Sequence, residues 1–168
     1  MAPFERLGAG TPARGAVWFV PVPITETLLV TGRAPGVTVV PMREAFQSDQ
    51  APEPGGSYSQ GIAAGDLFFT AGMGPIDPAT GQVVGETIEE QTAQVLDNLE
   101  AILAAAGLGW GDVVKVTTHL QELHRDFAGY DKVYRSRLVE PFPVRTTVGS
   151  QLMNILVEID VVAVRPSR

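Results

Sequence analysis

The sequence predicts an α+β domain in which two helices cover one face of a single mixed β-sheet. Two segments have helical patterns, short apolar strand-like segments precede, separate and follow them, and the chain has 168 residues with 45% hydrophobic side chains. The segments follow the order strand, strand, helix, strand, helix, strand, strand. This order segregates the helices to one face of one sheet. The regular pattern begins at residue 42.

The first predicted elements form a β-hairpin. Residues 61–64 and 67–71 are short apolar segments that flank Gly65-Asp66, a dipeptide typical of a tight turn. Residues 75–81 contain two prolines and a glycine and are predicted to form a loop.

The first helix has signals at both ends. Thr87 and Glu90 have the spacing of a capping box, and Gly107 follows the last apolar position. Between them, apolar residues recur at positions 88, 95, 96, 99, 102, 103 and 106. An amphipathic helix is therefore the most strongly predicted element.

A strand and a second helix follow. Residues 113–120 alternate between a mainly apolar even-numbered set and a polar odd-numbered set, which is typical of a strand with one more polar face. Residues 127, 130, 133, 134 and 138 then form an apolar helical stripe, and Pro141 ends the segment.

The last two predicted strands cover residues 145–149 and 155–164. In the second of them the odd positions are uniformly apolar, whereas the even positions mix apolar side chains with two carboxylates. Two helices can cover only one face of the sheet. A second, partly apolar face predicts a homo-oligomer with Glu158 at or near a subunit interface.

Composition excludes several classes of function. The net charge is −7, and residues 42–168 hold nine basic against 17 acidic residues, so nucleic acid is not an expected partner. The chain has no cysteine, which excludes disulfides and thiolate chemistry. No apolar run is long enough to span a membrane and no signal peptide is visible, so we expect no membrane partner and a cytoplasmic location.

The first 41 residues differ from the rest, because proline and glycine separate their short apolar clusters. We interpret residues 1–41 as an N-terminal extension and residues 42–168 as the domain. The sequence leaves open whether the extension is ordered or mobile.

Two lone charges stand inside apolar segments near the C-terminus. Arg145 lies in Phe-Pro-Val-Arg-Thr-Thr-Val, and Glu158 lies in Ile-Leu-Val-Glu-Ile-Asp-Val-Val. Because desolvating an unpaired ion costs several kcal/mol, such charges are usually paired, placed beside a cleft, or used to bind a ligand. A small carboxylate is the candidate ligand for this pair.

Seven motifs, in this order and spacing, resemble the RidA/YjgF family of enamine and imine deaminases. They are Ser57-Tyr58-Ser-Gln-Gly61, Thr70-Ala-Gly72, Pro75-Ile-Asp-Pro78-Ala-Thr-Gly81, Glu90-Gln-Thr92 with Asn98-Leu and Ala105-Ala-Gly107, Asp112-Val-Val-Lys115, Pro143-Val-Arg145-Thr, and Val157-Glu158-Ile-Asp160. The resemblance runs from about residue 42 to the C-terminus.

The resemblance implies a chorismate-mutase-like fold and a homotrimer with active sites in the clefts between subunits. It implies hydrolysis of enamines and imines such as 2-aminoacrylate and 2-iminopropanoate to 2-oxo acids and ammonia, without a metal or organic cofactor. Arg145 matches the arginine that binds the substrate carboxylate, and Glu158 matches the glutamate that positions water. Tyr58 matches a tyrosine lining the site. The backbones of Gly72 and Thr147 match main-chain contacts to substrate or water.

The same residues have structural interpretations. Arg145 and Glu158 are also typical of surface charges, and Tyr58 of simple packing. His119 and His124 lack a third ligand, so we expect no metal. Two other functions stay open: a non-catalytic trimer that senses a 2-oxo acid or amino acid, and an endoribonuclease or translation inhibitor, which the charge argues against.

Several positions depart from the family pattern. Ala71 replaces a common serine and Thr147 a common cysteine, and His124-Arg125-Asp126 appears where an asparagine is common. The connection over residues 149–154 is also short. We expect these departures to affect the substrate range more than the roles of Arg145 and Glu158.

Overall fold

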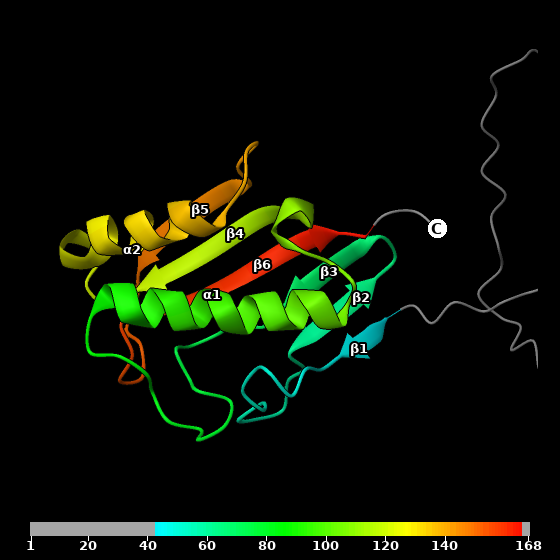
Figure 1. Cartoon of the computed structure of the whole chain (residues 1–168), viewed down its shortest axis with the longest axis horizontal. Helices are drawn as coiled ribbons and strands as arrows, with labels where there is room; N and C mark the ends of the chain where they lie inside the picture. The colour runs from blue at the N-terminus through cyan, green and yellow to red at the C-terminus, as the bar shows by residue number, and fades with distance from the viewer. Residues whose placement is uncertain (1–42, 166–168) are drawn as a thin grey trace, which may run out of the picture. The chain divides into compact units, whose positions relative to one another are not determined.

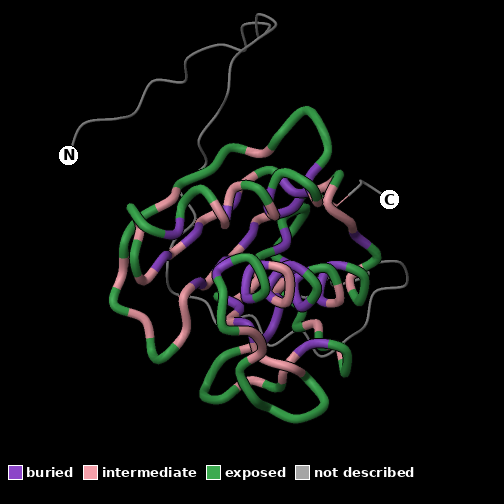
Figure 2. Tube along the Cα trace, turned by 60° about the vertical axis from the view of Figure 1, so that its left-hand side comes forward, coloured by how far each residue is buried: buried purple, intermediate pink, exposed green. Residues whose placement is uncertain are grey.

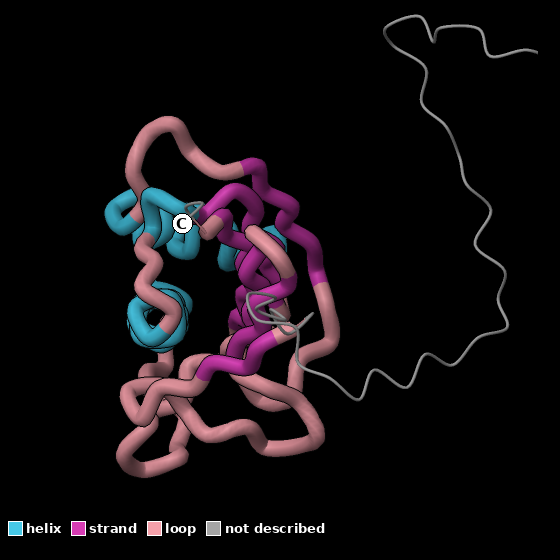
Figure 3. The backbone as a smooth tube through the Cα atoms, turned by 90° about the vertical axis from the view of Figure 1, so that its right-hand side faces the viewer, coloured by secondary structure: helices cyan, strands magenta, loops and turns pink. Residues whose placement is uncertain are grey.

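The computed structural model describes residues 43–165, and this part of the chain forms a two-layer α+β domain (Figures 1 and 3). Both helices lie on the same side of one mixed sheet, as the sequence predicts. The strands are β1 (Glu44–Phe46), β2 (Gly61–Ala64), β3 (Leu67–Thr70), β4 (Val113–Leu120), β5 (Val144–Gly149) and β6 (Val157–Val164). The helices are α1 (Ile88–Ala105) and α2 (Leu123–Arg137), with the short 3₁₀ turn η1 (Trp110–Asp112) before β4. The predicted N-terminal extension, residues 1–41, lies outside the described residues.

The sheet has six strands in the order β1-β2-β3-β6-β4-β5. All neighbouring pairs are antiparallel except β4 and β5, which run parallel because α2 connects them as a crossover. The C-terminal strand β6 thus lies in the middle of the sheet, and β5 forms an edge. The two charged candidates lie on different strands, Arg145 on β5 and Glu158 on β6. Strand β4 lies between these two strands.

The predicted hairpin is confirmed. Gly65 has φ 61°, a left-handed conformation that favours glycine, and it turns β2 into β3. The sequence pattern missed β1, whose three residues pair with β2. A strand of that length is too short to show a period.

The capping signals of α1 are also confirmed. The Thr87 hydroxyl accepts a hydrogen bond from the Glu90 amide, and the Glu90 carboxylate accepts one from the Thr87 amide. Five apolar residues of the helix are fully buried against the sheet; they are Val95, Leu96, Leu99, Ile102 and Leu103. The helix ends one residue before Ala106, and Gly107 follows with φ 72°.

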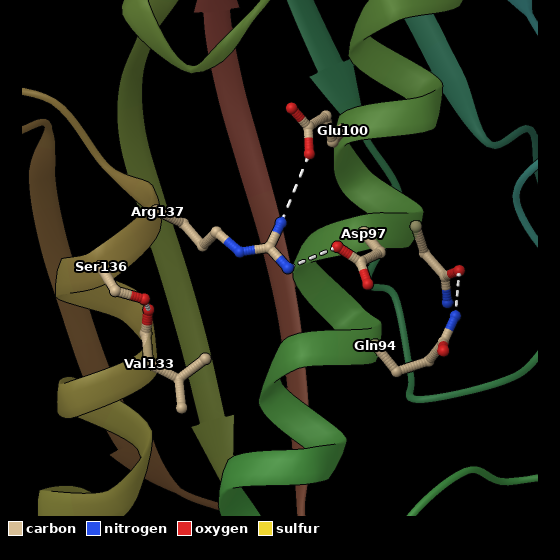
Figure 4. Close-up of polar contacts among 7 residues, drawn as sticks. Gln94, Asp97, Glu100, Val133, Ser136 and Arg137 are labelled. Atoms are coloured by element: carbon tan, nitrogen blue, oxygen red, sulfur yellow. Dashed lines mark hydrogen bonds and ion pairs between the residues drawn. The ribbon is translucent and has the colours of Figure 1, made fainter.

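The two helices are joined by an ion-pair cluster at their exposed surface. Figure 4 shows Arg137, the last residue of α2, reaching between Asp97 and Glu100 of α1, at 2.7 Å and 3.4 Å. In the same view the Ser136 hydroxyl donates to the carbonyl of Val133. Exposed pairs of this kind contribute about 0–1 kcal/mol each, so buried apolar contacts dominate the packing of the helices.

The core lies between the helices and the sheet, where buried segments of both layers meet (Figure 2). On β6 the odd-numbered residues 157–163 are at most 1% exposed, as the alternation predicts. On β4 the prediction is wrong at one position: Val114 is 43% exposed and Val113 is buried instead. A register shift between Val113 and Lys115 explains the difference, because a bulge moves the next side chain to the other face.

The opposite face of the sheet carries no helix in the part of the chain described. Leu67 and Phe69 of β3 are each 41% exposed on this face, next to Ile62 and Val162 of the neighbouring strands. We call the face that includes these residues and Glu158 the open face. Within residues 43–165 no helix is long and apolar enough to cross a membrane.

Candidate functional site

Arg145 points to the helix-covered side of the edge strand β5. Its Cα pairs with that of buried Val116 on β4, and its Nη1 donates a hydrogen bond to Oδ1 of Asp131 on α2 at 2.6 Å. The ion pair thus connects the edge of the sheet to the helix above it. The Arg145 side chain still has 26% of its surface exposed, and that of Asp131 has 22%.

Three aromatic rings of α2 surround the guanidinium. Its central carbon lies 4.8 Å from the ring centre of Tyr134 and 5.6 Å from those of Tyr130 and Phe127. The ring faces attract a cation, by about 0.5–2 kcal/mol each depending on exposure. Arg145 is therefore positioned by one carboxylate and an aromatic wall.

A pocket of about 330 Å³ opens beside this arginine. It is lined by Asp131, Tyr134, Arg135, Phe142, Pro143 and Arg145. Two cations, one anion and apolar surface face the same space, so a small organic anion fits the chemistry of the walls.

Burial favours the neutral form of the two tyrosines beside Arg145. It raises the pKa of Tyr134 to about 12, with contributions from Tyr130 and Asp131 and against the effect of Arg145. It also raises the pKa of Tyr130, although a hydrogen bond with Thr118 and the charge of Arg145 oppose this. Burial acts to lower the pKa of Arg145 and is the largest single effect, but the hydrogen bond to Asp131 and the charges of Asp131, Tyr130 and Tyr134 together raise it. At neutral pH Arg145 is therefore charged and both phenols are neutral.

Glu158 lies on the open face, because its neighbours Val157 and Ile159 point into the core. Its carboxylate rests against Gly72, which follows β3. A Cβ on Gly72 would lie 2.6 Å from Oε1 of Glu158, a distance too short for any side chain. The glycine is thus required for the carboxylate to hold this position.

Tyr58 and Gly72 line a second pocket, of about 550 Å³. Tyr58 is half exposed, and its hydroxyl accepts a hydrogen bond from the Gly55 amide at 3.0 Å. The loop of residues 76–81 forms the far wall. Because Glu158 touches Gly72, three of the five predicted site residues belong to this region.

Thr147 lies two residues after Arg145 and on the same side of β5. Its Oγ1 is buried without a hydrogen-bond partner in the described chain, as is the Tyr134 hydroxyl. The neighbouring Thr118 instead pairs with the Tyr130 hydroxyl at 2.8 Å. Unpartnered buried hydroxyls are uncommon, and these two flank Arg145.

The fold of the single chain therefore divides the predicted site into two groups. Arg145 and Thr147 face α2, whereas Glu158 lies on the open face and its carboxylate reaches Gly72. Residues on opposite faces of a sheet cannot hold one small ligand between them. Joining the two groups requires a neighbouring molecule.

Sequence reasoning missed Asp131 and treated Tyr134 only as an apolar stripe residue. The available signal was helical spacing, since positions 131, 134 and 135 share one helix side.

In the His124-Arg125-Asp126 segment, Arg125 has a structural role: it donates two 2.7 Å hydrogen bonds to the buried carboxylate of Asp126. The backbone amide of Ala71 donates a hydrogen bond to the carbonyl of Gln60. No group of three or more metal-ligating side chains occurs among the described residues.

A sequence profile described as Endoribonuclease L-PSP matches residues 48–165. The RutC family protein PH0854 of Pyrococcus horikoshii is 44% identical over 124 residues, which cover 73% of this chain and 98% of that protein. The chain belongs to the RidA/YjgF family.

Two further relatives of this RidA/YjgF chain carry more specific names. The 2-iminobutanoate/2-iminopropanoate deaminase of Salmonella typhimurium is 36% identical over 129 residues, covering 74% of this chain and 99% of the relative. The solved RidA structure from the Antarctic bacterium Psychrobacter sp. PAMC 21119 has a TM-score of 0.69 and 34% identity, covering 72% of this chain and 98% of that one. The structural similarity agrees with the α+β chorismate-mutase-like fold.

Proposed function

We propose that this RidA/YjgF protein hydrolyses 2-enamine and 2-imine intermediates, of the 2-aminoacrylate and 2-iminopropanoate type, to 2-oxo acids and ammonia. The single observation that supports this most strongly is the Arg145 guanidinium, which is held by an aromatic wall yet opens into a pocket of small-molecule size. An imino acid always carries a carboxylate, and a guanidinium binds one through two parallel hydrogen bonds.

The reaction needs one nucleophile and no external oxidant. The water oxygen forms a bond to C2 of the protonated imine, and Glu158 accepts the proton that the water loses. Glu158 passes this proton to the nitrogen of the carbinolamine. The C–N bond then breaks while Glu158 takes the hydroxyl proton, so that the C=O bond of the 2-oxo acid forms and ammonia leaves, taking that proton from Glu158. A 2-enamine enters this sequence after protonation at C3, which gives the same protonated imine. A positioned carboxylate base contributes about 10²–10⁴-fold to such a step. The reaction requires no metal or organic cofactor, because the protonated imine is already an electrophile.

A homotrimer with sites between subunits is part of the proposal. The open face has the exposed apolar residues that a subunit contact would bury, and the two groups of site residues lie on opposite faces of one chain. In a trimer, Arg145 and Thr147 of one subunit would meet Tyr58, Gly72 and Glu158 of the next.

The activity is tested with an amino-acid oxidase that generates imines in the presence and absence of this protein. We expect faster release of ammonia with the wild type, and a loss of at least about 100-fold with Glu158→Gln or Arg145→Ala. Glu158→Gln should still bind a 2-oxo acid. If no amino-acid-derived imine is hydrolysed faster than in buffer, the proposed deaminase activity is wrong.

The shared site is tested by mixing inactive subunits. When Arg145→Ala and Glu158→Gln chains are unfolded and refolded together in equal amounts, about a quarter of the interfaces in a randomly assembled trimer combine an intact Arg145 with an intact Glu158. Activity should return to about that fraction of the wild type. Sites contained within single subunits would give no recovery.

A further inference from the structure

Asp131 places a negative charge in the pocket that Arg145 opens. Its Oδ1 accepts the 2.6 Å hydrogen bond from Nη1 of Arg145, and its Oδ2 lies 3.5 Å from Nη2 of Arg135. All three side chains line the same pocket. The site beside the proposed carboxylate anchor is therefore not simply cationic.

The ion pair leaves part of Arg145 available. The hydrogen bond to Asp131 uses Nη1, and 26% of the Arg145 side-chain surface stays exposed. A guanidinium has five N–H donors, so an incoming carboxylate can bind the remaining edge. Arg135 is 71% exposed, and its charge is largely screened by water.

A ligand with only a negative charge meets a fixed carboxylate next to its anchor. A 2-amino or 2-imino acid differs, because one carbon separates its carboxylate from a cationic nitrogen. Opposite charges at hydrogen-bonding distance on the protein match opposite charges at a similar spacing on the ligand. The neutral hydroxyl of Tyr134, buried at the same wall without a partner in the described chain, adds a further polar group.

We infer that Asp131 is a specificity-determining residue that binds the cationic nitrogen of the substrate, so that the pocket selects 2-imino and 2-amino acids over 2-oxo acids. This inference rests on the proposed function. It also explains why the product would be released after hydrolysis. Hydrolysis replaces the cationic nitrogen with a carbonyl oxygen. The product oxygen then faces the Asp131 carboxylate and is repelled.

The test measures binding by titration calorimetry on the full chain, with L-alanine as the zwitterionic probe and pyruvate as the 2-oxo acid probe. For the wild type we expect tighter binding of alanine. Asp131→Asn should weaken alanine and strengthen pyruvate, changing the ratio of their dissociation constants by at least about 10-fold. Asp131→Glu, which keeps the charge, should restore the preference for alanine.

The control is Asp97→Asn, which removes an aspartate from a more exposed ion pair, with Arg137 at the helix surface (Figure 4). It should leave the ratio unchanged. A ratio that Asp131→Asn does not alter would overturn the inference, since Asp131 would then only orient Arg145. Absence of Arg145-dependent binding of either probe would also overturn it. These titrations measure binding without catalysis. They can therefore support or overturn the role of Asp131 even if the deaminase assay fails.

Discussion

At the scale of single residues, the site depends on one glycine as much as on its charges. Glu158 keeps its position because Gly72 has no side chain. The sequence does not reveal this contact, because Gly72 is one of 18 glycines and lies far from Glu158 along the chain. The close approach makes the carboxylate sensitive to the smallest possible substitution.

We expect Gly72→Ala to reduce imine hydrolysis by at least about 10-fold, because the new methyl group would displace the Glu158 carboxylate. Steady-state kinetics and circular dichroism should show a lower kcat with the fold retained. Gly111→Ala is the control, since a Cβ there meets nothing within 4 Å. Equal activity of both variants would show that the position of Glu158 is not critical.

The raised pKa of Tyr134 leads us to expect that the folded protein loses stability at alkaline pH. Burial raises its pKa to about 12 from the ordinary 10.0, so the unfolded chain loses this proton first. The stabilisation is complete below about pH 10 and is lost as pH rises towards about 12, by on the order of 1–3 kcal/mol. Urea unfolding from pH 8 to 11.5 should show a smaller decline for Tyr134→Phe than for the wild type. Parallel curves would contradict this role.

At the scale of elements, local signals account for most of the boundaries. The Thr87–Glu90 capping box starts α1, and Gly65 closes the first hairpin. Element β1 and the bulge in β4 were not predicted, because both arise from pairing with a neighbouring strand. Pairing partners are distant in sequence and leave no local pattern.

The capping box gives a stability prediction. Thr87→Ala removes the side-chain acceptor of the Glu90 amide and should lower the free energy of unfolding by about 1 kcal/mol. Chemical denaturation measures this difference. Ser136→Ala is the matched control, because its hydroxyl bonds only to the Val133 carbonyl within the same helix (Figure 4) and should change stability by less than about 0.5 kcal/mol. Similar losses in both variants would argue against a specific cap.

At the scale of the whole molecule, the open face decides the proposed assembly. Phe69 is 41% exposed there, between the apolar side chains of Ile62 and Val162. An apolar surface of this kind is stabilised when a second copy covers it. Glu158 lies on the same face, so the proposed assembly and the proposed activity depend on one surface.

Phe69→Asp should therefore prevent assembly and abolish activity together. Light scattering after size exclusion should show the mass falling from three times the chain mass to the chain mass of 17.9 kDa. Val139→Asp introduces the same charge at an exposed valine after α2 and should leave the mass unchanged. A monomeric wild type would contradict the proposed trimer.

The sequence by itself determined the elements other than β1, their order, the family, and the two charges that need a partner. These are local or linear properties: helical periods, caps, turns and motif order act over a few residues. Only the tertiary structure decided that Arg145 and Glu158 lie on opposite faces, that Asp131 shares the arginine pocket, and that Gly72 makes room for the glutamate. Such relations join residues that are distant in sequence, because strand order and register, rather than local propensity, bring them together.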